Sequence, residues 1–103
     1  MSEDLPIVCT LQPGDLNARA AELLPGLAAQ AASRQSIEGG CRLQFVATTD
    51  ILQTIFKVTD AERQCCRFLR FVVTVEPGGR PISLDITGPV GTSEFLAALI
   101  DGA

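Results

Sequence analysis

Short runs in which apolar and polar residues alternate are separated along this chain by longer segments with helical periodicity. Alternation is typical of strands with one buried face, whereas apolar residues spaced three and four apart are typical of amphipathic helices. The predicted strands are residues 7–11, 41–47, 71–76 and 82–87, and the predicted helices are residues 16–33, 50–68 and 92–100. The pattern therefore predicts the order β-α-β-α-β-β-α.

The connections limit how these elements can be arranged. Residues 77–81, Pro-Gly-Gly-Arg-Pro, are too few for anything except an antiparallel hairpin between the last two strands. The earlier helical crossovers would also allow parallel neighbours, so the pattern permits a mixed or an antiparallel sheet and leaves its strand order open. We expect an α+β two-layer sandwich with about four strands and three helices. Residues 1–103 are expected to form one domain, with residues 1–5 flexible.

Composition narrows the class of protein. With 103 residues, of which 47% are hydrophobic, the chain can bury one core. The net charge is -4, and the eight Lys and Arg residues are spread along the sequence, so nucleic acid is not an expected partner. The first residues are acidic and carry no apolar signal segment, and no apolar stretch approaches the roughly 18 residues of a membrane helix. These features predict a cytoplasmic protein that does not enter the membrane.

Histidine is absent from the sequence. Its absence excludes Ser-His-Asp and Cys-His catalysis, as well as zinc sites that contain histidine. Any catalytic or metal-binding chemistry must therefore use Cys, Glu, Asp or Arg side chains.

The vicinal pair Cys65 and Cys66 is the strongest candidate for such chemistry, because thiolates are both nucleophiles and ligands for soft metals. Glu62 lies one helical turn earlier, and the positive charges of Arg63 and Arg67 would favour the thiolate form. Neighbouring residues of a regular helix point about 100 degrees apart, so both sulfurs can face one ion only where the helix frays or ends.

A resemblance adds to this interpretation. The stretch Glu62-Arg63-Gln64-Cys65-Cys66-Arg67-Phe68, together with Cys9-Thr10-Leu11, Gly40 to Phe45 and Leu84 to Pro89, resembles a family of small bacterial proteins. They occur alone or are associated with mercury-resistance-type regulators. Members carry the pattern Glu-Arg-x-Cys-Cys-x-Phe, often with proline where this chain has Arg67. The resemblance implies a soft-metal or thiol role for Cys9, Glu62, Cys65 and Cys66.

We therefore predict a protein that sequesters, delivers or senses a soft metal ion such as Hg(II), Cu(I) or Zn(II). Its ligands would be Cys65 and Cys66, with Cys9 on the inward face of the first strand and Glu62. No other cofactor is expected. Cys41 is expected to pack in the core as a small apolar side chain.

Two alternatives remain open. One is a thiol enzyme acting on organometallic or sulfur substrates, with Glu62 as proton donor, which requires burial to raise the pKa of Glu62. The other is an interaction module. In that case Val8, Val46 and Val72 would lie on an uncovered sheet face and drive homodimer formation or binding to a regulator protein.

Overall fold

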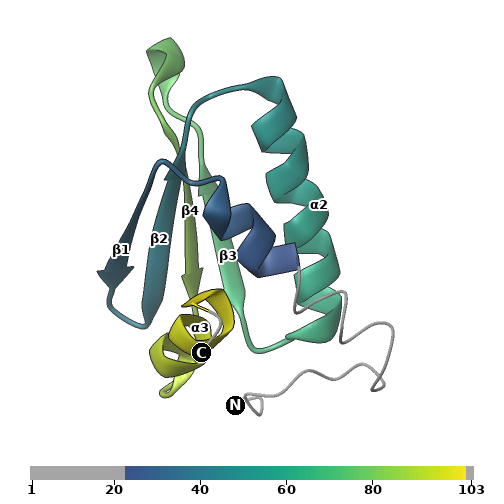
Figure 1. Cartoon of the computed structure of the whole chain (residues 1–103), viewed down its shortest axis with the longest axis vertical. Coiled ribbons are helices and arrows are strands. Elements are labelled where there is room, and N and C mark those ends of the chain that lie inside the picture. The colour runs from purple at the N-terminus through teal and green to yellow at the C-terminus, as the bar shows by residue number, and fades with distance from the viewer. Residues whose placement is uncertain (1–22, 102–103) are drawn as a thin grey trace.

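A computed structural model describes residues 23–101 of the chain, which fold into a four-stranded sheet and helices (Figure 1). Residues 23–29 are helical. The elements that follow are β1 (Ser33–Ile37), β2 (Gly40–Phe45), α2 (Thr49–Cys65), β3 (Arg70–Thr74), the 3-10 turn η1 (Pro77–Gly79), β4 (Ile82–Thr87) and α3 (Thr92–Asp101). The predicted α+β class is confirmed.

The sheet is antiparallel throughout, with the strand order β1-β2-β4-β3. Along β2 and β4 every second side chain is buried, and the register places the buried side chains directly opposite each other. The pairs are Cys41 with Ile86, Leu43 with Leu84, and Phe45 with Ile82. These two central strands therefore carry the fully buried side chains of the sheet.

The helices lie on one face of the sheet and complete the core (Figure 1). Residues 23–29 contribute Leu24 and Leu27, α2 contributes Ile55 and Val58, and α3 contributes Leu96, all nearly inaccessible to solvent. This layer covers the inner face of the sheet and positions the C-terminal end of α2 close to α3.

The other sheet face carries mostly polar side chains among the described residues. Arg42 donates from Nε to Asp85 at 2.7 Å and from a terminal nitrogen at 2.9 Å, and Gln44 donates to Ser83 at 3.2 Å. Val72 lies opposite Asp85 in the register and is exposed. Val46 follows the end of β2, and Val8 lies outside the described residues. Val46 and Val72 are thus exposed apolar side chains, and an association of this face with a second copy or a regulator protein stays a prediction.

The largest difference between the predicted and the observed secondary structure lies before β2. The predicted helix extends to Ser33, but the described helical residues end at 29, and β1 begins at Ser33. The side chains of β1 are exposed except for a half-buried Ile37, so no alternating pattern marks this strand. The predicted strand 7–11 and the expected flexible residues 1–5 lie outside the described residues.

Helix α2 begins and ends slightly earlier than predicted. Its N-cap is Thr48, rather than Thr49 or Asp50, and the Thr48 hydroxyl accepts a hydrogen bond from the Ile51 N–H at 3.1 Å. The helix ends at Cys65 instead of continuing to Phe68, and Cys66 is its C-cap. No helix among residues 23–101 has the length and apolar character needed to cross a membrane.

Candidate functional site

Glu62 lies on the buried face of α2, where its neighbours along the helix are apolar. Ile55, Val58, Glu62 and Cys66 recur at steps of three and four residues, which places them on one side of the helix. All four are buried, and Glu62 is 0% exposed. The sequence therefore brings a carboxyl group into the interface between α2 and the sheet, where apolar side chains would normally lie.

The surroundings of Glu62 favour the protonated acid. Neither carboxylate oxygen has a well-formed hydrogen bond to any group in the described part of the chain. Burial raises the pKa of Glu62 from 4.5 to about 7, and the nearby Cys66 side chain opposes this rise only in part. A carboxyl group with this pKa can exchange a proton near neutral pH.

The backbone leaves the helix between the two cysteines. Cys65 is the last residue of α2, and Cys66 has φ -108° and ψ 76°, outside the helical range. The Cys66 N–H still donates to the Glu62 carbonyl at 2.6 Å, and the Cys66 carbonyl accepts from the Leu69 N–H at 3.1 Å. The pair thus lies where a helix becomes a turn. The angle of about 100 degrees between neighbouring side chains of a regular helix therefore does not apply to Cys65 and Cys66.

Aromatic packing connects this turn to α3. The rings of Phe68 and Phe95 meet edge to face, with their centroids 5.1 Å apart. Phe68 is buried, and its carbonyl oxygen lies close to Gly88 at the end of β4. These contacts fix the turn that carries Cys66 against the end of the sheet and the final helix.

The structure brings together two of the four predicted site residues. Glu62 and Cys66 lie side by side in the core, and the Cys66 thiol is not in a disulfide. Cys65 is placed by its backbone only, and Cys9 lies outside the described residues. Among the described side chains, no three His, Cys, Asp or Glu residues form a cluster that could hold a metal ion.

The two arginines near the cysteine pair are exposed. Arg63 is engaged at the surface, where it forms an ion pair with Asp60 at 2.8 Å, and Arg67 is exposed in the turn after α2. That these charges favour a thiolate stays a prediction. Cys41 is buried as expected, on β2, and burial raises the pKa of its thiol.

The sequence named burial of Glu62 only as a condition of the enzyme alternative and did not predict it, because a glutamate on an amphipathic helix is usually solvated. A signal was nevertheless present. Glu62 lies four residues after Val58 and four before Cys66, so it occupies the apolar stripe itself.

Comparison of the chain with protein-family models, with curated proteins and with solved structures finds no match.

Proposed function

We propose that this protein binds a soft or borderline metal ion through the thiolates of Cys65 and Cys66, with Glu62 as an oxygen ligand and Cys9 as a further sulfur ligand. The binding would serve sequestration, delivery or sensing of Hg(II), Cu(I) or Zn(II). The observation that carries the proposal is the fully buried Glu62 carboxylate, which lacks a well-formed hydrogen bond and lies beside the Cys66 thiol.

The chemistry of these donors supports the proposal. A buried carboxylate without hydrogen-bond partners is unfavourable unless a cation or proton neutralises it. A metal ion held by thiolate sulfur and carboxylate oxygen would supply that neutralisation, and Zn(II) takes both kinds of ligand, whereas Hg(II) and Cu(I) depend mainly on the sulfurs. The helix end between the cysteines is compatible with both contributing to one site.

Native mass spectrometry of the anaerobically reduced protein tests this proposal. The protein would be titrated separately with Hg(II), Cu(I) and Zn(II), and we expect one ion per chain to be retained for at least one metal. Cys65→Ser and Cys66→Ser should each lose this tight binding. Glu62→Gln should weaken Zn(II) binding more than Hg(II) binding, because carboxylate oxygen is a poorer ligand for the softer ion.

Cys41→Ser is the matched control, since it removes a second buried thiol that lies on another element. This variant should bind metal as wild type does. Stoichiometric binding that survives both the Cys65 and the Cys66 substitutions, or binding no tighter than that of one free thiol, would contradict the proposal.

A second candidate function is favoured by one specific observation, the raised pKa of Glu62 beside a thiol. In a thiol enzyme that cleaves a carbon–metal bond, a cysteine thiolate would bind the metal of the substrate. The protonated Glu62 would then donate its proton to the carbon as the bond breaks, releasing a hydrocarbon.

Gas chromatography of the products from an organomercurial substrate distinguishes the two functions. An enzyme would release hydrocarbon over many turnovers, and Glu62→Gln would abolish that release while still binding Hg(II). Absence of hydrocarbon from a protein that binds Hg(II) tightly would leave metal binding as the function.

A location in the cytoplasm belongs to the same proposal, because the thiols need a reducing compartment to stay available. The metal ion is the proposed partner, and association as a homodimer or with a regulator protein is a further part of the proposal. Sedimentation velocity of the reduced protein, with and without metal, measures the self-association.

A further inference from the structure

Two strands, β1 and β3, form the edges of the sheet in its described part. The backbone N–H and C=O groups along an edge strand can pair with a further strand, and proteins usually protect such edges with charged or polar side chains. All side chains of β1 except Ile37 are polar, whereas β3 and the residue after it have the sequence Arg-Phe-Val-Val-Thr-Val. The edge formed by β3 is therefore the one without this protection.

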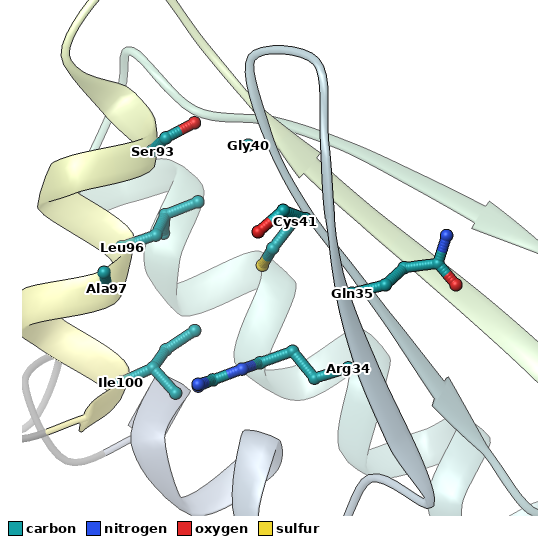
Figure 2. A pocket seen from close by; sticks show the side chains of 9 residues that line it. Arg34, Gln35, Gly40, Cys41, Ser93, Leu96, Ala97 and Ile100 are labelled. Carbon is teal, nitrogen blue, oxygen red and sulfur yellow. The ribbon is translucent and has the colours of Figure 1, made fainter.

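The helical side of β1 borders a cavity of about 330 Å³ between the β1–β2 part of the sheet and α3 (Figure 2). The side chains that line it include Arg34 and Cys41 on the strands and Leu96, Ala97 and Ile100 on α3. Figure 2 shows the Arg34 side chain extending from β1 toward Ile100. A charged side chain on an edge strand opposes pairing with another chain, so β1 is a poorer candidate for association than β3.

The sheet register shows which side the backbone groups of β4 face. The Gly88 N–H donates to the Gly39 carbonyl at 3.1 Å, and these two residues continue the register of β2 with β4. Hydrogen-bonded and non-hydrogen-bonded pairs alternate along an antiparallel ladder, so Leu84 and Ile86 also bond to β2. The residues of β4 that alternate with them, which include Asp85, therefore point their backbone groups toward β3.

The same alternation assigns the two sides of β3. Val72 lies opposite Asp85, so its backbone groups bond to β4, and those of Phe71 and Val73 face the open edge. The N-cap of η1 is still extended, with φ -95° and ψ 156°, so the alternation continues to Val75. The side chains of Phe71 and Val73 are half-buried, and that of Val75 is exposed. This edge therefore presents three apolar residues together with their backbone donors and acceptors.

We propose that β3 pairs with β3 of a second copy of this chain, antiparallel and centred on Val73. A two-fold axis at this residue places Val73 opposite the partner's Val73 and Phe71 opposite the partner's Val75. All three outward-facing residues of each strand then meet outward-facing residues of the other, which is the arrangement of hydrogen-bonded pairs in an antiparallel ladder. The two four-stranded sheets would become one continuous sheet.

Neighbouring registers of the same pairing use these backbone groups less well. Moving the centre one residue toward the N-terminus brings the Leu69 N–H into the ladder, but this N–H already donates to the Cys66 carbonyl at 3.1 Å. Moving the centre one residue toward the C-terminus brings Pro77, which has no N–H, opposite the partner's Phe71. The register centred on Val73 avoids both losses.

Charge complementarity selects the same register and a second copy as the partner. Centred on Val73, the pairing places Arg70 opposite the partner's Glu76, and the two-fold axis repeats this pair at the other end. Both side chains are exposed, and opposite charges directly across two antiparallel strands attract each other. A shift of the centre by one residue in either direction separates them. The interface lies at the edge of the sheet and does not depend on the proposed metal binding.

Sedimentation velocity of the reduced, metal-free protein over a range of concentrations tests this proposal. We expect a monomer–dimer equilibrium, because a single pair of edge strands is a small interface. Val75→Lys places a charge against the partner's Phe71 and should weaken the dimer at least about tenfold. Val90→Lys is the matched control, since Val90 is 99% exposed outside the strands, and it should dimerise as wild type does.

A charge exchange tests the register. Glu76→Arg turns both attractive pairs of the dimer into repulsive ones and should weaken it about tenfold. The double variant Arg70→Glu with Glu76→Arg restores opposite charges and should recover most of the affinity. Equal dimerisation of wild type, Glu76→Arg and the double variant would overturn this register.

Hydrogen exchange measured by NMR locates the interface and reports whether each variant is folded. The amides of Phe71, Val73 and Val75 should be protected increasingly as the concentration rises, whereas Val72 should be protected at every concentration by its bond to β4. The proposal is overturned if the protein is a monomer at millimolar concentration, or if folded Val75→Lys dimerises as wild type does. Protection of the edge amides that is independent of concentration would overturn it as well, because a strand of the same chain, such as predicted strand 7–11, would then cover the edge.

Discussion

At the scale of single residues, Glu62 combines a cost in stability with a proposed chemical role. A carboxyl group in a core, with neither oxygen well hydrogen-bonded among the described residues, destabilises the folded state whenever it is ionised. Groups with strongly shifted pKa values are concentrated at functional sites, because binding and catalysis need them. The adjacent Cys66 thiol is the reason that metal binding and proton transfer are the two functions proposed for this carboxyl group.

The raised pKa gives stability a defined pH dependence. The pKa of Glu62 is 4.5 when the chain is unfolded and about 7 when it is folded, so the folded state holds the proton more tightly. Its contribution to stability is fully present below pH 4.5 and is lost as the pH rises through about 7. From about pH 5 to about pH 8 the metal-free protein should lose roughly 2 to 3 kcal/mol through this group.

Urea denaturation of reduced, metal-free protein at these two pH values measures the loss. Glu62→Gln has no titratable group at this position and should lack this part of the pH dependence. Glu38→Gln, an exposed carboxyl in the turn between β1 and β2, is the control and should behave as wild type does. Parallel pH profiles for wild type and Glu62→Gln would show that Glu62 is solvated.

At this scale, the sequence predicted which side chains lie near each other better than how deeply they are buried. The proximity of Glu62 to Cys66 follows from helical spacing, and it was predicted. The burial of Glu62 depends on how α2 is rotated against the sheet. That rotation is set by tertiary packing of the apolar stripe and not by the identity of residue 62.

At the scale of elements, strongly patterned segments were predicted well and the polar edge strand was not. Residues 82–87 were predicted as a strand with the bounds that β4 has, because buried and half-buried residues alternate along it. β1 is exposed and held mainly by its pairing with β2, so its local sequence carries little signal. The cavity that Arg34 and Cys41 help to line could not be predicted for the same reason.

Two glycine substitutions test the packing of these elements. Gly40 begins β2 where it pairs with β4, and a Cβ there would collide with the backbone carbonyl of Ile86. Gly40→Ala should therefore destabilise the protein by several kcal/mol, about 3 or more, because backbone must move. Gly26 lies in the helical residues 23–29, and a Cβ there meets nothing within 4 Å.

Gly26→Ala is thus the matched control and should stabilise the protein by up to about 1 kcal/mol. Both variants can be measured by chemical denaturation. Similar stability of the two variants would contradict the close approach of β2 to β4 at Gly40.

At the scale of the whole molecule, α3 connects the proposed metal site with the cavity. Phe95 of α3 packs on Phe68 in the turn after Cys66, while Leu96, Ala97 and Ile100 line the cavity. The sheet behind them has a buried inner face and a mostly polar outer face in its described part. The proposed metal site and the cavity therefore both lie on the side of the sheet that the helices cover.

The Phe68–Phe95 contact, which holds the turn after Cys66 against α3, should contribute measurably to the free energy of unfolding. We expect a double-mutant cycle with Phe68→Leu and Phe95→Leu to give a coupling energy of about 1 kcal/mol in thermal or chemical denaturation. A coupling energy indistinguishable from zero would mean that the turn is held by other contacts.

X-ray absorption spectroscopy of the protein loaded with its tightest-binding metal tests the proposed thiolate site, because it reports which atoms surround the ion. We expect sulfur neighbours whose number falls in Cys66→Ser and is unchanged in Cys41→Ser. A metal surrounded only by oxygen or nitrogen, or a spectrum unaffected by Cys66→Ser, would contradict a thiolate site at the end of α2.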